Sequence, residues 1–262
     1  MRTVLVLVFF LFAIASNGQT NTYLADLAAL NSVLQKTPSY KSQIKGDKQA
    51  FYNTLYERLA SDTTSNPHSF NYFYNLSQLV FPLKDNHLVF YQIADYDNFK
   101  NKKRIDSFIA TKEFLDYPTC KINIDSLKTE LAKKPADSVE GIYHYGKFYS
   151  IGLFKKSDKE YVGVVVDSGV NLWRKGQVAV HLYEYAPNLF KAIYGHPLFK
   201  NYILQTNEKY RNQSLVNSYF YSSYSQDIYS KQLRPVDYVN LSKNALKFEL
   251  KSINDDGQYL LL

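Results

Sequence analysis

The chain has 262 residues and a formal net charge of +7 at pH 7, and its basic residues are scattered. Without a concentrated basic stripe or a recognisable binding module, nucleic acid is excluded as a partner. The hydrophobic fraction of 45% can fill one large core or two small ones, and the single cysteine, Cys120, excludes an internal disulfide. We expect Cys120 to be half-buried and inert.

The first predicted element is a signal peptide over residues 1–18. Arg2 supplies its positive charge, residues 4–15 form its apolar run, and small residues precede a cut after Gly18, with a cut after Ala15 as the alternative. A membrane-spanning helix needs about 20 apolar residues, and this run is shorter. We therefore expect an exported mature chain, periplasmic or extracellular, with no stable insertion in the membrane after cleavage.

Residues 19–137 are predicted to form a helical N-terminal domain. Apolar residues over 24–34 recur at the three-and-four spacing of one helix face, and Thr37-Pro38 ends that helix. Gly46-Asp47 opens a second helix, with Asp47 as its N-cap. The remaining predicted segments are a helix between Pro67 and Pro82, a strand over 88–91, and weaker helical stretches over 105–116 and 124–134.

Residues 138–253 alternate between apolar and polar side chains and are predicted to form a β-rich domain. The predicted strands cover 141–145, 149–155, 161–166, 177–185, 190–194, 202–206, 215–221 and 246–250. Many short strands separated by turn signals predict an antiparallel barrel or sandwich, so the expected fold class is α+β, with a helical bundle first. The 24 tyrosines and 17 phenylalanines also favour surfaces that stack on sugars or peptides.

Three segments together carry a resemblance to a known family. The helical part ends in residues 77–87 (SQLVFPLKDNH), the β part begins at residues 140–143 (EGIY), and residues 259–262 (YLLL) follow a turn over 254–257. This arrangement resembles the N-terminal portion of secreted bacterial serine peptidases of the S41 family, the tail-specific and tricorn-core group. The resemblance implies that residues 254–262 begin a catalytic α/β domain that is missing here.

His87 is the catalytic candidate that the resemblance implies. In the tricorn-type branch, the His of an Asp-x-His signature is the general base that takes the proton from the serine nucleophile. Other branches use a Ser–Lys dyad, in which this His has no such role. Asn86 and Leu88 depart from the Gly and Thr that are usual in the family. The alternative is a structural, hydrogen-bonding His between a helix and a strand.

The other histidines and the only tryptophan are further candidates for site residues. His68, His144, His181 and His196 show no metal-ligand spacing, so neither a metal nor a cofactor is expected. Trp173 lies beside a turn and is predicted to pack across a barrel end rather than to bind a ligand.

Two functions are consistent with these patterns. The first is the non-catalytic N-terminal part of an S41-like secreted serine endopeptidase, which supplies a general-base His and a surface that docks a polypeptide substrate or braces the catalytic domain. A general base alone accelerates nothing, so this part is expected to be inactive by itself. The alternative is an extracytoplasmic binding module with an aromatic-lined β barrel for a peptide, sugar or apolar ligand.

Overall fold

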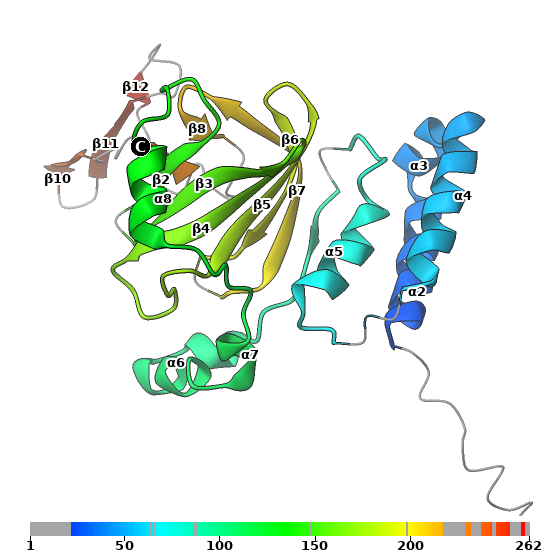
Figure 1. Cartoon of the computed structure of the whole chain (residues 1–262), viewed down its shortest axis with the longest axis horizontal. Helices are drawn as coiled ribbons and strands as arrows, with labels where there is room; N and C mark the ends of the chain where they lie inside the picture. Colours follow the sequence, from blue (N-terminus) through cyan, green and yellow to red (C-terminus); the bar gives the residue numbers. More distant parts are fainter. Residues whose placement is uncertain are drawn as a thin grey trace, which may run out of the picture. The chain divides into compact units, whose positions relative to one another are not determined.

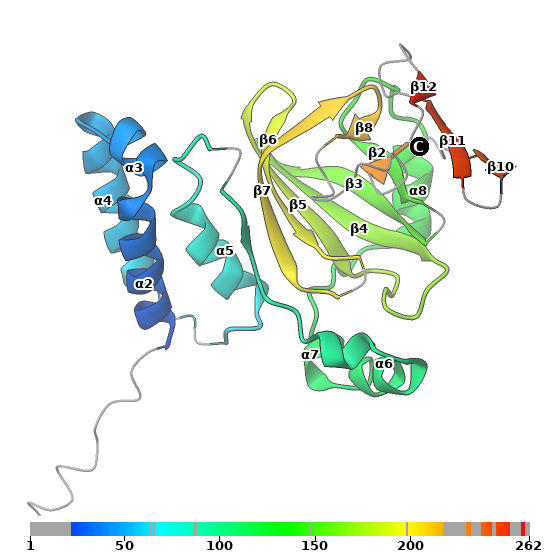
Figure 2. The same cartoon turned by 180° about the vertical axis from the view of Figure 1, so that it is seen from behind.

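A computed structural model describes most of the chain (Figures 1 and 2). The described residues are 22–62, 64, 66–85, 88–146, 148–197, 199–216, 229–231, 237–242, 245–251 and 258–259. Their contacts form two compact units, with the boundary between Leu83 and Lys84. The predicted signal peptide lies outside the described residues. None of the helices in the described part combines the length and the apolar character that a membrane span requires.

The first unit is built from helices. Thr37-Pro38 ends the first helix as predicted, and the Oγ1 atom of Thr37 then caps the next helix by accepting the N–H of Tyr40 at 3.2 Å. Gly46, rather than Asp47, is the N-cap of the third helix, because its φ of 57° is a conformation that favours glycine. The helices are α2 (Thr22–Lys36), α3 (Pro38–Gln43), α4 (Asp47–Ala60) and α5 (Phe70–Gln78).

Tyrosines tie the helices of the first unit together. The hydroxyl of Tyr23 donates to the carbonyl of Leu59 at 3.1 Å, which joins α2 to α4. The hydroxyl of Tyr72 donates to Asp26 at 2.6 Å, which joins α5 to α2. The rings of Tyr23 and Tyr72 meet edge to face, 5.3 Å apart. Tyr23 and Tyr72 are both buried and hydrogen-bonded, so they act as structural residues in this unit.

The second unit contains a closed antiparallel β barrel of eight strands. Around the barrel the order is β7-β6-β5-β4-β3-β2-β9-β8, and β8 pairs again with β7. Figure 1 shows the long strands β3 to β7 side by side. Their bounds are β2 (Gly141–Tyr145), β3 (Tyr149–Ser157), β4 (Glu160–Ser168), β5 (Val178–Ala186), β6 (Leu189–Gly195), β7 (Tyr202–Arg211), β8 (Ser214–Leu215) and β9 (Tyr229–Ser230).

Shorter elements precede the barrel strands. The two-residue strand β1 (Phe90–Tyr91) pairs antiparallel with β7 at Ile203 and Leu204. It is followed by η1 (Tyr96–Phe99), α6 (Lys102–Phe108), α7 (Lys112–Leu115) and α8 (Ile124–Leu131). Helix α8 lies on the outer face of β2 to β4, where Leu127 and Leu131 pack against Val166 (Figure 1).

A separate three-stranded sheet follows the barrel strands in the sequence. Its order is β10 (Asp237–Ser242), β11 (Ala245–Lys251) and β12 (Gln258–Tyr259), all antiparallel. Strand β12 lies within residues 254–262, for which the sequence predicts the first strand of a further domain. The other residues of that stretch lie outside the described part.

The α+β fold class is confirmed, and the barrel is the correct alternative of the two that the strand pattern left open. Six predicted strands coincide with β2 to β7, and a seventh with β11, although β7 runs on to Arg211. The prediction over 215–221 meets β8 at Leu215, and its remainder from residue 217 lies outside the described part. The change of pattern near residue 138 marks the first barrel strand, whereas the compact unit begins at Lys84.

The barrel interior is a continuous stack of aromatic side chains. Trp173 stacks on Tyr149 at 5.1 Å between ring centroids, as predicted for a residue that packs across a barrel end. Tyr149 and Tyr229 share a hydroxyl–hydroxyl hydrogen bond of 2.5 Å, and Tyr229 stacks on Tyr194 at 5.5 Å. Tyr194 then donates to the buried carboxylate of Glu208 at 2.8 Å. These rings fill the interior that a small barrel encloses.

Candidate functional site

The strand β1 lies at one end of the strand order of its sheet. Phe90 pairs with Leu204 and Tyr91 with Ile203 on β7. No further strand of the described residues pairs with β1 on its other side. An edge strand of this kind presents main-chain groups that another chain can pair with.

Gln92 fastens the end of β1 to the start of β7. Its main-chain N–H donates to the carbonyl of Tyr202 at 2.9 Å, and its carbonyl accepts from the side chain of Asn201 at 2.6 Å. Its side-chain oxygen accepts the N–H of Tyr202 at 3.0 Å. Main-chain groups alternate in direction along an antiparallel strand, and the N–H of Gln92 faces β7, so we infer that the groups of its neighbours Tyr91 and Ile93 are directed away from β7.

Apolar side chains are exposed beside these outward main-chain groups. Tyr91 is 50% exposed, Ile93 is 84% exposed and Tyr96 is 57% exposed. Tyr91 ends the strand, and Ile93 and Tyr96 follow it within five residues. We refer to the main chain of residues 91–93 and these three side chains as the β1 edge.

The connection between β6 and β7 contacts the segment of the β1 edge through hydrogen bonds and ring packing. We define the β6–β7 turn as residues 196, 197 and 199–201. His196 N–H donates to Asn201 at 2.7 Å, and Lys200 N–H donates back to His196 at 3.0 Å. The Nδ1 atom of His196 accepts the N–H of Phe199 at 3.1 Å. The ring of Phe199 in turn packs edge to face against Tyr96, 5.0 Å away.

Lys200 points from this turn into a box of aromatic rings. Its Nζ atom lies 3.5 Å from the ring centroid of Trp173, 3.9 Å from that of Tyr117 and 5.0 Å from that of Phe114. The side chain is buried, and Nζ donates to the Oε1 atom of Gln177 at 2.8 Å. Burial, with a contribution from nearby Arg174, lowers the pKa of Lys200 to about 6.

The backbone at Lys200 is also unusual. Its φ of 61° lies in the left-handed region, which costs a non-glycine residue about 1 kcal/mol or more. This conformation closes the β6–β7 turn. A strained backbone that places a basic side chain in an apolar box marks this turn as a functional candidate.

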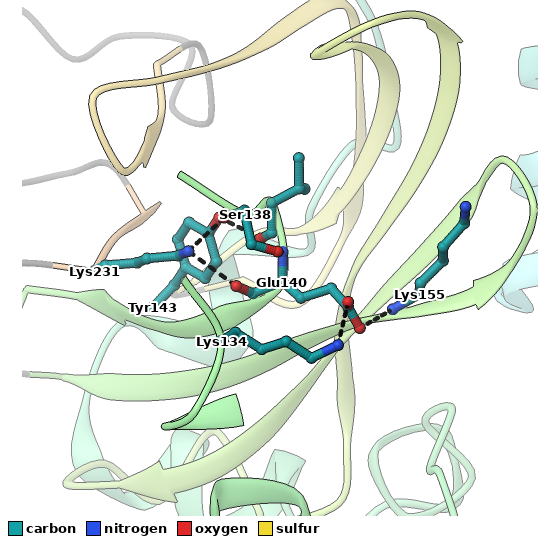
Figure 3. Close-up of polar contacts among 7 residues, drawn as sticks. Lys134, Ser138, Glu140, Tyr143, Lys155 and Lys231 are labelled. Carbon is teal, nitrogen blue, oxygen red and sulfur yellow. Dashed lines mark hydrogen bonds and ion pairs between the residues drawn. The ribbon is translucent and has the colours of Figure 1, made fainter. Parts of the chain in front are cut away.

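A second lysine, Lys231, is held by polar contacts beside the start of β2 (Figure 3). The Nζ atom of Lys231 donates to the carbonyl oxygens of Ser138 at 2.5 Å and Glu140 at 2.9 Å, and lies 5.4 Å from the ring centroid of Tyr143. The carboxylate of Glu140 accepts from Lys134 at 2.6 Å. These contacts join the residue after β9 to the segment before β2, so the cluster closes the barrel.

The charge state of Glu140 follows from the same contacts. Burial acts to raise the pKa of Glu140, but the hydrogen bonds from the Lys134 ammonium and the Lys155 N–H outweigh it and bring this pKa below its usual range. Glu140 is therefore a stable carboxylate that bridges two elements, and not a proton-transfer group.

His87, the sequence-predicted catalytic residue, lies outside the described residues, as does Asn86. Next to that gap, the N–H of Leu88 donates to the carbonyl of Asp85 at 3.4 Å. The general-base role of His87 therefore stays a prediction. The structure describes the strand that follows it, which begins at Phe90.

The other candidate residues from the sequence lie on different elements of the fold. His68 is exposed in the first unit, while the Nδ1 atom of His144 lies 2.8 Å from Ser150 Oγ on the neighbouring strand. His181 lies on β5, and burial lowers its pKa to about 3. Cys120 is half-buried as predicted. In the part of the chain that the structure describes, no group of His, Cys, Asp and Glu side chains could hold a metal ion.

Comparisons with protein-family models, with curated proteins and with solved structures found no match for this chain. The resemblance to S41 peptidases thus rests on the sequence segments that suggested it.

Proposed function

We propose that this chain is an exported polypeptide-docking module, which binds an extended segment of another protein as an added strand on the β1 edge. The observation that carries the proposal is that β1 ends the strand order of its sheet beside the exposed side chains of Tyr91 and Ile93. Main-chain hydrogen bonds to an added strand provide affinity, and alternate side chains provide selectivity.

The expected affinity is modest. Each added main-chain hydrogen bond contributes about 0.5–1.5 kcal/mol net. Covering the side chain of Ile93 contributes roughly 1.5–3 kcal/mol. Because association also costs translational and rotational entropy, we expect these few contacts to give weak, readily reversible binding. The proposed partner is therefore an extended segment with apolar side chains at alternate positions.

The peptide alternative is favoured over a sugar or apolar ligand inside the barrel. The interior rings from Trp173 to Tyr194 are buried against one another. A ligand inside the barrel would have to displace them, whereas the β1 edge is exposed already. We therefore place recognition on the outside of the barrel.

The same location supports the peptidase-related proposal. His87 stands three positions before Phe90, the first residue of β1, in the sequence. In this proposal, residues 22–83 form a helical bundle. The chain supplies a docking edge, and also a general base when a catalytic domain with a serine nucleophile completes it. Alone, it is inactive.

The docking proposal is tested by binding of an unfolded polypeptide to the chain without residues 1–18. The probe is fluorescein-labelled lactalbumin, reduced and carboxymethylated, and the readout is fluorescence anisotropy at about 0.3 M salt to screen the basic charge of the chain. We expect saturable binding that Ile93→Pro weakens about tenfold, because proline removes the outward N–H.

Two variants complete this test. Ile93→Ala keeps the N–H and separates the main-chain contribution from that of the side chain. Phe148→Ala removes a ring that is 40% exposed on another turn and should leave binding unchanged. Absence of saturable binding, or equal binding by the parent and Ile93→Pro, contradicts the proposal.

A further inference from the structure

The β6–β7 turn holds an amine that is poorly matched to its surroundings. Lys200 is only 5% exposed, and the one side-chain acceptor that its Nζ atom reaches in the described part of the chain is Gln177. No ion pair joins it to a carboxylate among those residues. An ammonium has three donors and is strongly hydrated in water, so a buried one with a single acceptor is unfavourable unless other groups compensate.

The groups packed around Lys200 do not supply an opposing charge in direct contact. From the connection between β4 and β5 come Trp173 and Arg174, and the guanidinium of Arg174 adds positive charge. Phe114 and Tyr117 come from α7 and the residues after it, Gln177 precedes β5, and His196 follows β6. Ring faces attract an ammonium, but they offset its lost hydration only in part.

The turn contains a second group whose contacts require the neutral form. His196 accepts the N–H of Phe199 at Nδ1, and a protonated imidazole has no acceptor there. Burial lowers the pKa of His196 to about 4, well under that of Lys200. As pH falls, Lys200 therefore takes up a proton first and His196 follows.

The same turn is the support of β1. Asn201 and Tyr202 make the hydrogen bonds that hold Gln92. The ring of Phe199 packs against the rings of Tyr96 and Phe99 in η1. Because Lys200 directly precedes Asn201 in the chain, movement of its side chain out of the box disturbs the backbone at Asn201. The proton-sensitive group and the docking edge are thus separated by a single short turn.

We propose that acidification expels the side chain of Lys200 from its aromatic box and, through Asn201 and Tyr202, releases the β1 edge, so that the chain gives up a bound polypeptide in mildly acidic surroundings. The last step of this proposal rests on the proposed docking function. The opening of the turn stands on the geometry of Lys200 alone.

The opening can be measured without any ligand, because Trp173 is the only tryptophan of the chain and its ring contacts Lys200 in the box. Its fluorescence is recorded from about pH 8 to about pH 4.5, with circular dichroism to establish that the chain stays folded. We expect a red shift of the emission with a midpoint near pH 6, the pH at which Lys200 takes up its proton.

Three variants make the fluorescence test specific. Lys200→Met fills the box with an uncharged side chain and should abolish the transition, and Lys200→Gln serves if the methionine variant does not fold. Lys191→Met changes another buried lysine, which lies over the ring of Tyr185, and should keep the transition. An emission that is constant down to pH 5, or a shift that persists in Lys200→Met, overturns the proposal.

Coupling to docking is tested with the same lactalbumin probe at about pH 7.5 and about pH 5.5. We expect about tenfold weaker binding at the lower pH for the parent and equal binding at both values for Lys200→Met. A fluorescence transition without polypeptide binding at either pH supports the opening and contradicts the docking function. Binding without a fluorescence transition supports docking and contradicts the switch.

Discussion

Lys231 shows how one side chain can close a barrel whose last strands are very short. Strands β8 and β9 have two residues each, so they supply few main-chain hydrogen bonds. Lys231 adds bonds to two carbonyls across the join, and its stem occupies the space beside Gly141. A Cβ atom at Gly141 would lie 2.6 Å from Lys231 Cε, so the glycine leaves room for the lysine stem.

Removing this ammonium tests its contribution. Lys231→Met keeps the apolar stem over Tyr143 but loses every donor, which leaves the carbonyls of Ser138 and Glu140 without their partner. We expect the free energy of unfolding to fall by about 1–3 kcal/mol, as for a lost hydrogen bond to a charged group. Urea unfolding followed by circular dichroism measures the change.

The matched control is Lys102→Met, which breaks an exposed ion pair with Asp106. Such surface pairs contribute little, so its effect should stay within about 0.5 kcal/mol. Equal stability of Lys231→Met and the parent would contradict the role of Lys231.

Trp173 and Lys200 illustrate what a single sequence reveals about individual residues. The packing of Trp173 was predictable, because a large ring beside a turn in a strand-rich region has few other places to go. The burial of Lys200 was not, since lysine is almost always exposed, and its box comes from segments that lie more than twenty residues away in the sequence. The Lys-Asn pair at residues 200–201 suggests a turn, but not what the lysine side chain contacts.

At the scale of elements, the contact between α8 and the barrel depends on Gly152. This residue lies on the outer face of β3, where a Cβ atom would come within 2.9 Å of Leu131 and 3.0 Å of both Leu127 and Val166. The absence of a side chain therefore lets the helix approach the strand closely.

We expect Gly152→Ala to destabilise the chain by about 1–3 kcal/mol, because three branched side chains would have to move. Thermal unfolding measures the loss. In a double-mutant cycle, Gly152→Ala should cost less in a Leu131→Ala background, where the space beside the glycine is vacated, than in the parent. An equal cost in both backgrounds would show that the approach of α8 is not the cause.

The strands were predictable to different degrees for a physical reason. β2 and β7 alternate between buried and more exposed side chains, whereas β4 and β6 are short apolar runs that are buried almost throughout. Each of the strands β2 to β7 pairs with its neighbour in the sequence, so local pattern is enough. The position of β1 required knowledge of its partner, since Gln92 and Tyr202 are 110 residues apart. The β1 edge as a candidate site was therefore beyond a reading of local pattern, although the strand itself was expected.

At the scale of the whole molecule, the pH dependence of stability follows from two classes of buried groups. Lys200 has a pKa of about 6 in the folded chain and an ordinary value of 10.5 when unfolded. Between these values the unfolded state binds one more proton, so stability rises with pH, by up to about 1.4 kcal/mol per unit. Above about pH 10 the sign reverses, because burial raises the pKa of tyrosines such as Tyr117, Tyr149 and Tyr194.

We therefore expect the free energy of unfolding to increase from about pH 6 to a maximum near pH 9–10 and then to fall. Urea unfolding at a series of pH values measures the curve. Lys200→Met should flatten its rising part and leave the alkaline decline in place. A parent curve that is flat between about pH 6 and 9 would show that Lys200 does not titrate as its burial implies.

The order of strands around the barrel has a consequence for the kinetics of folding. β2 to β8 form a chain of hairpins, each closed over a short loop, so they can form one after another at low entropic cost. The pairing of β9 with β2 joins Tyr145 to Tyr229 and must wait until both edges exist. We expect the docking of β9, secured by Lys231, to be the final folding step, so that the open, nearly complete meander is the species most exposed to aggregation.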